Sequence, residues 1–155
     1  MENIFKSSIT VRYAETDQMG IAHHANYPIW YEEGRTLYIK HYGLTYSKME
    51  EMGILLPLLK LECEYKRALQ YEDDATVYTF MSDGSRTKMQ FSYVLAREGK
   101  ICATGKSIHG IVDKNLRPFN FEKKFPELYG LLMRVITDEK QAIAQIKKEL
   151  KTNGE

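Results

Sequence analysis

The stretch Asn26-Tyr-Pro-Ile-Trp-Tyr-Glu-Glu-Gly-Arg-Thr-Leu-Tyr-Ile-Lys-His-Tyr42 decides the fold, because it predicts a long helix with apolar residues on more than one side. Asn26 is typical of a helix N-cap, and Gly43 tolerates the left-handed backbone that ends a helix. At about 1.5 Å per residue the helix spans roughly 25 Å, the width of a small domain. A helix that is apolar around most of its circumference is predicted to be largely buried.

Strands surround this helix in the sequence. One strand is expected before it, over 4–13, and a short helix after it, over 47–52. Four further strands are expected over 55–66, 75–81, 87–97 and 101–112. In the run 87–97, apolar residues alternate at period two, which is typical of a strand. Gly99 and the Asp83-Gly84 pair predict tight turns, so the last three strands form an antiparallel meander.

Two helical segments are expected at the C-terminus. The first covers 122–135 and is interrupted near Pro126, and the second covers 138–151 with one apolar stripe. This second helix is predicted to cover either its own sheet or a neighbouring subunit. Because a single sheet must cover its apolar face, the long apolar helix is the expected filler. The fold class is therefore α+β, an antiparallel sheet curled around one long central helix.

Length and composition exclude several classes of protein. The 155 residues predict one domain, 1–155, with a C-terminal helical extension over about 121–152. The formal net charge of +1 argues against nucleic acid or an anionic membrane as partner. Cys63 and Cys102 lie in apolar strands without metal-ligand spacing, so no metal site is predicted. No stretch has the length and apolarity of a signal peptide or membrane span, so a reducing cytoplasm is the expected location.

The densest polar cluster, 15–27, lies between a strand end and the start of the long helix. The first backbone N–H groups of a helix have no partner within the helix, and they lie at the positive end of its dipole. Such groups can bind a developing oxyanion. A carboxylate opposite them, for which Asp17 is the candidate, can attack a carbonyl or deprotonate a water molecule that does so.

The stretch Tyr13-Ala-Glu-Thr-Asp17-Gln-Met-Gly20-Ile-Ala-His-His24-Ala-Asn26-Tyr27, followed by Tyr31-Glu32 and Arg35-Thr36, resembles the signature of the 4-hydroxybenzoyl-CoA thioesterase family. The Tol–Pal-associated acyl-CoA thioesterase branch is the most similar. The resemblance covers roughly the first 115 residues and implies a hotdog fold and hydrolysis of an acyl-CoA thioester. It also implies a homodimer or dimer of dimers with active sites at the subunit interface. CoA enters as part of the substrate, and no cofactor is implied.

The resemblance also assigns roles to individual residues. Asp17 is the expected nucleophile or general base, the backbone N–H of His24 is expected to polarise the thioester oxygen, and Gly20 leaves room for the thioester. Tyr27 is a core aromatic that also lines the acyl pocket. The basic residues expected to contact the CoA phosphates are Arg67, Arg86 and Lys88. Arg86 and Lys88 are expected to share one face of a strand, and Arg117 is a further candidate.

Two rival functions stay open at this point. A hydratase or dehydratase of the same fold would use a histidine and a helical acid, for which His24 with Glu32 or Glu33 are the candidates. A non-catalytic module that binds acyl-CoA or an acyl carrier would need no catalytic Asp17. The sequence leaves open the acyl group, the choice between CoA and a carrier protein, and the choice between dimer and tetramer.

Overall fold

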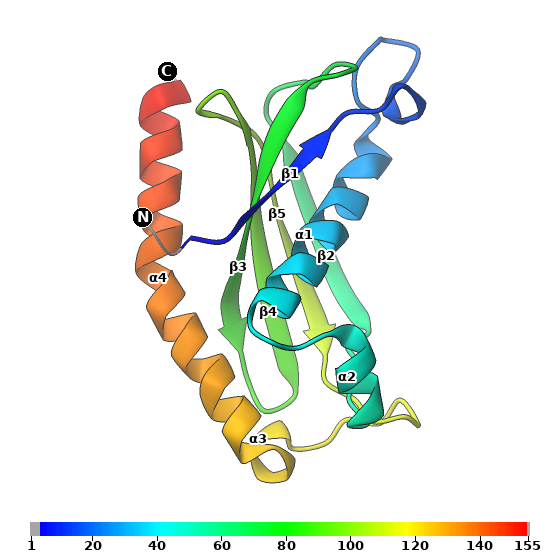
Figure 1. Ribbon diagram of the computed structural model, residues 1–155, viewed down its shortest axis with the longest axis vertical. Helices are drawn as coiled ribbons and strands as arrows, with labels where there is room; N and C mark the ends of the chain where they lie inside the picture. The colour runs from blue at the N-terminus through cyan, green and yellow to red at the C-terminus, as the bar shows by residue number, and fades with distance from the viewer. Residues whose placement is uncertain (1–3, 155) are drawn as a thin grey trace.

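A computed structural model describes residues 4–154 of the chain, with side chains up to 150. Its centre is a five-stranded antiparallel sheet with the strand order β1-β3-β4-β5-β2 (Figure 1). The strands are β1 (Lys6–Thr10), β2 (Leu58–Tyr65), β3 (Asp74–Gly84), β4 (Lys88–Arg97) and β5 (Lys100–Gly110). The predicted fold class, α+β with a sheet around one helix, is confirmed. Among the described residues, no helix is long and apolar enough to cross a membrane.

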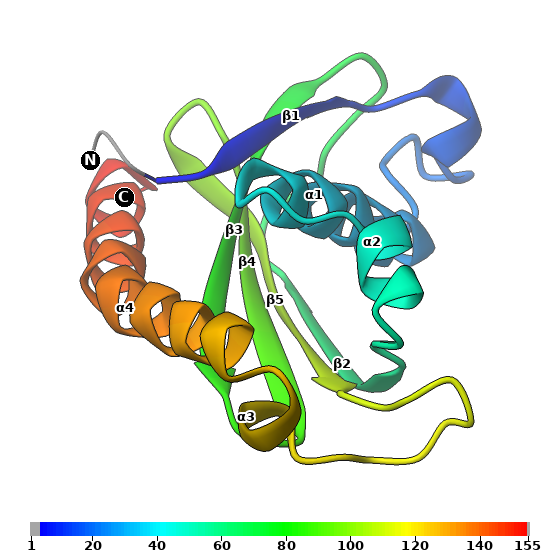
Figure 2. The ribbon, with the colours of Figure 1, turned by 60° about the horizontal axis from the view of Figure 1, so that its bottom comes forward.

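The central helix α1 (Tyr27–His41) lies inside the curve of the sheet (Figure 2). Two glycines allow this close approach. A Cβ added at Gly34 would lie 2.8 Å from Oγ1 of Thr79 on β3, and one added at Gly105 on β5 would lie 2.6 Å from the ring of Tyr31. The Tyr31 ring instead stacks on Tyr93 of β4, with 4.6 Å between ring centroids. The absence of side chains at these two positions therefore sets how deeply α1 sits in the sheet.

Three further helices complete the fold: α2 (Tyr46–Glu51), α3 (Phe121–Lys124) and α4 (Pro126–Gly154). Helix α4 runs along the side of the sheet that carries β3 (Figure 1). Its second half places Ile146 and Leu150 against the sheet face away from α1, where they bury Phe80, Val94, Ala96 and Ile101. The C-terminal helix thus covers its own sheet, one of the two predicted alternatives.

Helix α4 differs from the prediction in its continuity. The break expected between 135 and 138 is wrong, because a single helix runs through this segment. The Thr137 hydroxyl donates a hydrogen bond to the Met133 carbonyl one turn earlier, at 3.0 Å, and so supports the helix instead of capping a new one. The predicted interruption near Pro126 is confirmed, since Phe125 leaves the helical conformation and Pro126 begins α4.

The turn between β3 and β4 also differs from the prediction. Asp83 and Gly84 were expected to form it, but both belong to β3 and pair with Gln90 and Met89. A register shift between Met81 and Asp83 carries the strand further than its hydrophobic pattern indicates. Arg86 therefore lies in the turn, and the prediction that it shares a strand face with Lys88 is wrong. The Gly99 turn is confirmed, with φ of +52° at Glu98 and +76° at Gly99.

The edge of β3 is only half covered by β1, which pairs with residues 74–78. Beyond this point the buried carboxylate of Glu139 on α4 replaces a strand partner. Its Oε2 accepts hydrogen bonds from the Met81 backbone N–H and the Tyr38 hydroxyl, both at 2.7 Å. Its Oε1 accepts one from the Tyr42 hydroxyl at 3.3 Å. Burial raises the pKa of Glu139, so α4 is docked through an acid group that is costly to ionise.

Gly105→Ala is expected to lower the free energy of unfolding by about 1–3 kcal/mol, the usual cost of overpacking a core. The added methyl would meet the Tyr31 ring and, at 3.0 Å, the Glu62 carbonyl oxygen, and the backbone atom has little freedom to move. Gly130→Ala in α4 is the control, because the nearest atom is the end of the Arg134 side chain at 3.4 Å. Urea denaturation should show Gly130→Ala to be neutral or stabilising by up to about 1 kcal/mol. Equal losses in the two variants would contradict the packing argument.

Glu139→Leu is expected to cost about 2–4 kcal/mol, because it leaves the buried Tyr38 hydroxyl without an acceptor and the Met81 N–H with only the longer bond to the Tyr38 oxygen, at 3.3 Å. Glu139→Gln retains an acceptor oxygen and should cost far less. Since the raised pKa means that the folded state holds this proton more tightly, the contribution of Glu139 to stability falls as pH rises above the ordinary value of 4.5. The unfolding free energy of Glu139→Gln relative to wild type should therefore improve between pH 4 and pH 7. A difference that does not change with pH would disprove this account.

Candidate active site

The polar cluster of the sequence forms a short hairpin beside the start of α1. The His23 N–H donates to the Glu15 carbonyl at 2.8 Å, and the Asp17 N–H donates to the Ile21 carbonyl at 2.9 Å. Thr16 and Ala22 form a β-bridge between these two pairs. The far strand of this hairpin, called here the 15–23 hairpin, leads directly into the 3-10 turn His24–Asn26 and α1.

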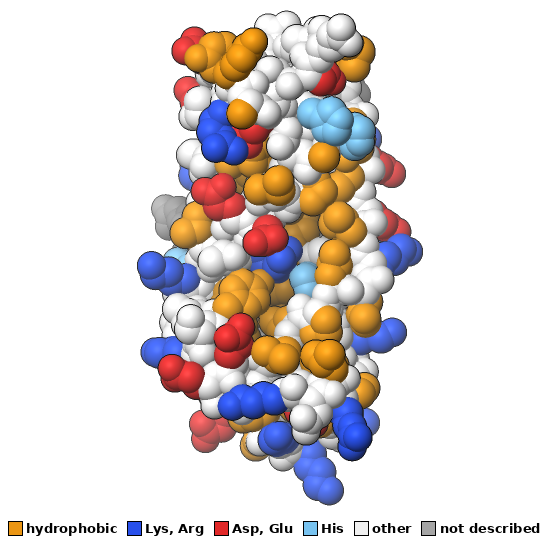
Figure 3. Space-filling model, turned by 90° about the vertical axis from the view of Figure 1, so that its right-hand side faces the viewer, with side chains coloured by type: hydrophobic (Ala, Val, Ile, Leu, Met, Phe, Trp, Pro, Cys, Tyr) orange, Lys and Arg blue, Asp and Glu red, His pale blue; other side chains and the backbone are white. Residues whose placement is uncertain are grey.

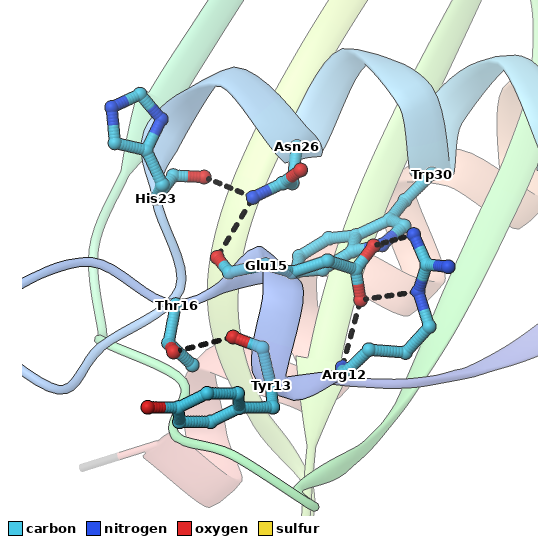
Figure 4. Close-up of polar contacts among 7 residues, drawn as sticks. All are labelled: Arg12, Tyr13, Glu15, Thr16, His23, Asn26 and Trp30. Carbon is cyan, nitrogen blue, oxygen red and sulfur yellow. Dashed lines mark hydrogen bonds and ion pairs between the residues drawn. The ribbon is translucent and has the colours of Figure 1, made fainter.

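Glu15 ties the 15–23 hairpin to α1, a role that the sequence did not predict. It is 4% exposed, and its Oε2 accepts a hydrogen bond from the Trp30 indole N–H at 3.0 Å (Figure 4). Its Oε1 accepts one from the Arg12 backbone N–H at 2.8 Å and lies 3.4 Å from Arg12 Nε. Burial raises the pKa of Glu15, but these hydrogen bonds and the Arg12 charge outweigh it and lower the pKa below its usual value. Glu15 is therefore a structural anion held beneath the helix.

Asn26 occupies the predicted N-cap position of α1, but its backbone is helical and its side chain makes no capping hydrogen bond. Instead its amide group donates to the carbonyls of Glu15, at 2.8 Å, and His23, at 3.2 Å, so it clamps the base of the hairpin (Figure 4). His23 caps the preceding 3-10 turn His24–Asn26 instead, because its Nδ1 accepts a hydrogen bond from the Ala25 N–H at 3.1 Å.

Asp17 lies on the outer half of the 15–23 hairpin and is partly exposed. Its Oδ1 accepts a hydrogen bond from the Met19 N–H at 2.8 Å, and its carbonyl accepts one from Gly20 at 3.0 Å. Oδ2 has no hydrogen-bond partner within residues 4–154. Gly20 has a φ of +80°, and a Cβ there would meet nothing within 4 Å, so the backbone conformation is what requires glycine in this chain. A surface depression lies beside the carboxylate and is lined by Tyr13, Ala14, Thr16, Asp17, Gln18, Gly20 and Tyr71.

His24 is the first residue of the turn that leads into α1. Its ring is exposed and stacks on His23, with 4.2 Å between centroids. Its carbonyl accepts a hydrogen bond from the Tyr65 hydroxyl at 3.2 Å. In the described part of the chain its backbone N–H has no acceptor. The Asp17–Ile21 pair lies two ladder positions, roughly 7 Å, beyond the Glu15–His23 pair, so the carboxylate and this free N–H belong to one small region.

Two predicted substrate-binding residues lie at the same end of the sheet. Tyr27 is 3% exposed and packs against Trp30 and Tyr65, with centroids 4.9 and 4.8 Å away. Burial raises its pKa to about 12, so its hydroxyl stays protonated. Arg67 is exposed, and its backbone N–H donates to the Cys102 carbonyl at 3.0 Å. Two residues further on, the Leu69 carbonyl accepts the Ala22 N–H of the 15–23 hairpin, so Arg67 lies at the same end of the sheet as the hairpin that carries Asp17.

The other two predicted phosphate ligands lie elsewhere. Arg86 and Lys88 precede or begin β4, whose far end, Arg97, lies on the side of the 15–23 hairpin. Ten strand residues span about 30 Å, so the sheet separates these cations from Asp17 of the same chain. Arg86 also forms an exposed ion pair with Glu122 at 3.0 Å. The structure therefore does not bring together the four predicted substrate-binding residues within one chain.

A buried polar chain beneath α1 was not predicted from the sequence. Arg35 donates from Nη1 to the Tyr93 hydroxyl at 2.9 Å and from Nε to the Tyr46 hydroxyl at 2.8 Å. The Tyr93 hydroxyl continues to the Ser107 hydroxyl, which lies 2.9 Å from His109 Nε2. The sequence contained one indication of this buried chain. Arg35 follows Tyr31 by one helical turn, on the face of the helix that the sheet must cover.

The candidate acids of the rival hydratase face away from this region. Glu32 and Glu33 are both exposed on α1. Within residues 4–154 neither contacts His24, whose ring stacks on His23. The structure thus does not bring together the histidine and acid that this alternative requires.

Comparisons with known proteins agree with this architecture. The model of the thioesterase-like superfamily matches residues 11–151. A putative acyl-CoA thioesterase of Bacillus subtilis, YneP, is 42% identical over 81% of this chain and 92% of its own length. A putative esterase of Aquifex aeolicus is 36% identical over 76% of this chain and 91% of its own. The crystal structure of a DHNA-CoA thioesterase from Staphylococcus aureus superposes with a TM-score of 0.76 and 30% identity, over 90% of this chain and 92% of that one.

The family match covers α1, strands β2 to β5 and most of α4, and the likeness to solved hotdog thioesterases confirms the predicted hotdog fold. Both the 15–23 hairpin and α1 lie inside the matched residues 11–151. The chain therefore belongs to the thioesterase-like superfamily.

Proposed function

We propose that this protein hydrolyses the thioester of an acyl-CoA, releasing a free acid and CoA. The observation that carries the proposal is the unpaired backbone N–H of His24 beside the hairpin that holds the Asp17 carboxylate. Membership of the thioesterase-like superfamily supports the reaction class, and the names of the Bacillus and Staphylococcus relatives support CoA as the thiol.

The proposed chemistry follows from the two groups. The His24 N–H, at the positive end of α1, donates to the thioester oxygen and stabilises the negative charge that develops on it. The Asp17 Oδ2 atom is the free oxygen of the carboxylate, while Oδ1 is held by the Met19 N–H. It either attacks the carbonyl carbon, to give an acyl-aspartate that water then opens, or removes a proton from an attacking water. In both routes the thiolate of CoA leaves with the electron pair of the C–S bond and takes up a proton.

The Glu15 and Asn26 contacts preorganise this arrangement. Asn26 joins both strands of the hairpin base, and Glu15 fixes the hairpin to Trp30 on the first turns of α1. A catalytic carboxylate on an otherwise exposed loop needs such support, because a displacement of about 1 Å can cost 10²-fold in rate. Tyr27 lines the start of the acyl site in this proposal.

Asp17→Asn is expected to lower kcat by about 10²-fold or more, since the amide neither attacks nor accepts a proton. Asn retains the Oδ1 acceptor for Met19, so the melting temperature should stay close to that of wild type. Asp113→Asn is a matched control, because Asp113 Oδ1 also accepts the N–H two residues ahead, at 2.8 Å, and lies in a loop at the other end of the sheet. Release of free CoA from short, long and aromatic acyl-CoAs is the measurement. Near wild-type hydrolysis by Asp17→Asn would rule out the mechanism.

The same assay separates the two rivals. A hydratase would change the acyl group without releasing free CoA, and a binding module would bind acyl-CoA without turnover. Single-turnover hydrolysis in ¹⁸O-labelled water separates the two routes for Asp17, because label first enters the aspartate in the acyl-aspartate route and the released acid in the other.

We further propose that the active form contains a homodimer joined at β2. This strand ends the sheet, and one of its edges has no partner in the described chain. Exposed apolar side chains gather on the face that carries β2 and α1 (Figure 3), and they belong to Ile29, Leu37, Leu58, Leu59, Leu61 and Tyr65. A long apolar edge strand is normally paired or covered. In a two-fold antiparallel pair, opposite ends of the two sheets lie side by side, which is how Arg86 and Lys88 of one copy would approach CoA in the other.

Replacing both Leu59 and Leu61 by Lys is expected to give a monomer, because a charged edge strand resists pairing. Light scattering should report twice the 18.1 kDa chain mass for wild type and the single mass for the variant. Leu116→Lys is the control, since Leu116 is 68% exposed but lies in a loop away from β2. A monomeric wild type at high concentration would exclude the dimer.

A further inference from the structure

We infer that Arg35 and Tyr31 form a recognition site for a negatively charged oxygen, such as a carboxylate, at the far end of the acyl group. The inference rests on the proposed function, since it adds a substrate class to the same site. Two groups carry it: a cation without an acid partner, and a buried hydroxyl without any partner.

Arg35 is the first of these groups. Its guanidinium has five N–H donors, of which the structure occupies one at Tyr46 and one at Tyr93. The remaining donors have no acceptor, and the charge has no carboxylate partner, within residues 4–154. Burial lowers the pKa of Arg35, but Tyr93 and Tyr46 raise it by more, so the charge persists beneath the helix. Arg35 is half-buried and its unused donors are open to solvent, so water compensates this charge only in part.

The neighbouring hydrogen bonds offer no compensation, because their direction is fixed. Burial and the Arg35 charge lower the pKa of His109 to about 4, so its ring is neutral. Its Nδ1 lies 3.2 Å from the Leu56 carbonyl and must donate, which leaves Nε2 to accept from Ser107. Ser107 then accepts from Tyr93, which accepts from Arg35. No group in this hydrogen-bonded chain carries a negative charge, so the charge of Arg35 is not neutralised and its other donors stay unused.

Tyr31 supplies the second group. Its hydroxyl is buried and has no hydrogen-bond partner, although its ring is fixed by stacking on Tyr93. Tyr31 and Arg35 are four residues apart and therefore share one face of α1. An unpaired buried hydroxyl costs about 1–3 kcal/mol, so a ligand oxygen that accepts from it gains this amount. Both groups lack an acceptor, and a carboxylate brings acceptors and the missing negative charge.

The position of these groups matches an acyl chain that starts at the proposed thioester site. Tyr65 links the regions, because its hydroxyl donates to the His24 carbonyl and its ring packs on Tyr27. From the first residue of α1, Tyr31 lies about 6 Å and Arg35 about 12 Å along the helix axis. On the face that carries α1 and β2, apolar side chains surround a hollow (Figure 3). An acyl group that enters beside His24 and follows α1 meets Tyr31 first and Arg35 at its far end.

The test compares pairs of substrates that differ only at the far end. Mono-CoA thioesters of short and medium dicarboxylic acids are assayed beside the monocarboxylic acyl-CoAs of equal length. At one length, wild type should prefer the dicarboxylic substrate in kcat/KM by about 10- to 100-fold, the range for hydrogen bonds to charged groups. Arg35→Met should reduce this preference to about one, chiefly by raising KM for the dicarboxylic substrate. Tyr31→Phe removes only an unpaired hydroxyl, so it should keep stability and reduce the preference several-fold.

Several results would overturn the inference. Equal kcat/KM for both members of every pair leaves hydrolysis standing and removes the recognition site. A preference that appears only for hydroxyaryl over plain aryl acyl-CoA would assign a neutral ligand instead of a charged one. Sedimentation of Arg35→Met, and of the milder Arg35→Lys, tests another source of the negative charge. If these variants dissociate the protein without changing substrate preference, the acid partner of Arg35 belongs to a second copy of the chain. If no thioester is hydrolysed at all, calorimetry with the free dicarboxylates still decides, because wild type should bind them and Arg35→Met should not.

Discussion

The buried carboxylate of Glu15 is the interaction on which the candidate site depends. It joins three parts of the chain: the end of the segment that follows β1, through the Arg12 N–H; the 15–23 hairpin, to which it belongs; and α1, through Trp30. A neutral side chain of the same shape would satisfy only some of these donors. Because Arg12 adds a positive charge at 3.4 Å, the carboxylate is stable as an anion in a place where few acids ionise. The hairpin is thereby fixed to the helix whose first N–H groups it faces.

Glu139 performs a related task at the other end of α1, with the opposite electrostatic balance. Both carboxylates accept a backbone N–H from a strand segment and a ring donor from α1. Glu15 has a guanidinium beside it, whereas Glu139 has the like charge of Asp138 and only neutral tyrosines. Protonation at low pH therefore weakens the attachment made by Glu15, whereas it removes the cost of burying an ionised Glu139. The helix is thus held at its ends by polar contacts and in its middle by the close approach at Gly34 and Gly105.

Much of this fold follows from patterns in the sequence. The apolar helix that ends at Gly43, the period-two run in β4 and the Gly99 turn each have a local physical cause, and each is found where it was predicted. The misses have non-local causes. Asp83 and Gly84 stay in β3 because a bulge shifts their pairing, and α4 continues past 135 because nothing in its backbone stops it. Propensity identifies turn residues but gives no information on a bulge that tertiary pairing stabilises.

The candidate site shows the same division. Asp17, Gly20 and His24 lie within nine residues, so a local pattern places them together, whatever their roles prove to be. Glu15 and Trp30 are separated by a hairpin. Arg35 binds Tyr93, and through it is linked to His109, only because the sheet brings distant strands beneath the helix. Nothing in the sequence distinguishes the buried Glu15 from the exposed Glu32 or Glu33. Only the three-dimensional arrangement shows that Glu15 is the acid whose side chain is buried and hydrogen-bonded to the helix.

The sheet leaves one place where substrate specificity can vary without loss of the fold. One of its faces is occupied by α1 and part of the other by the second half of α4, and β1 and α4 cover the β3 edge. The side between α1 and β2 carries a group of exposed apolar side chains, and it is also where Tyr31 and Arg35 keep unused donors. The buried Tyr31 hydroxyl lowers stability as long as it has no acceptor, and a ligand or a partner can supply one. In the proposed mechanism the groups at the helix start act only on the carbonyl, whatever the rest of the acyl group is. The two proposals therefore divide the site: the start of α1 determines the reaction, and the α1–β2 side determines which acyl group undergoes it.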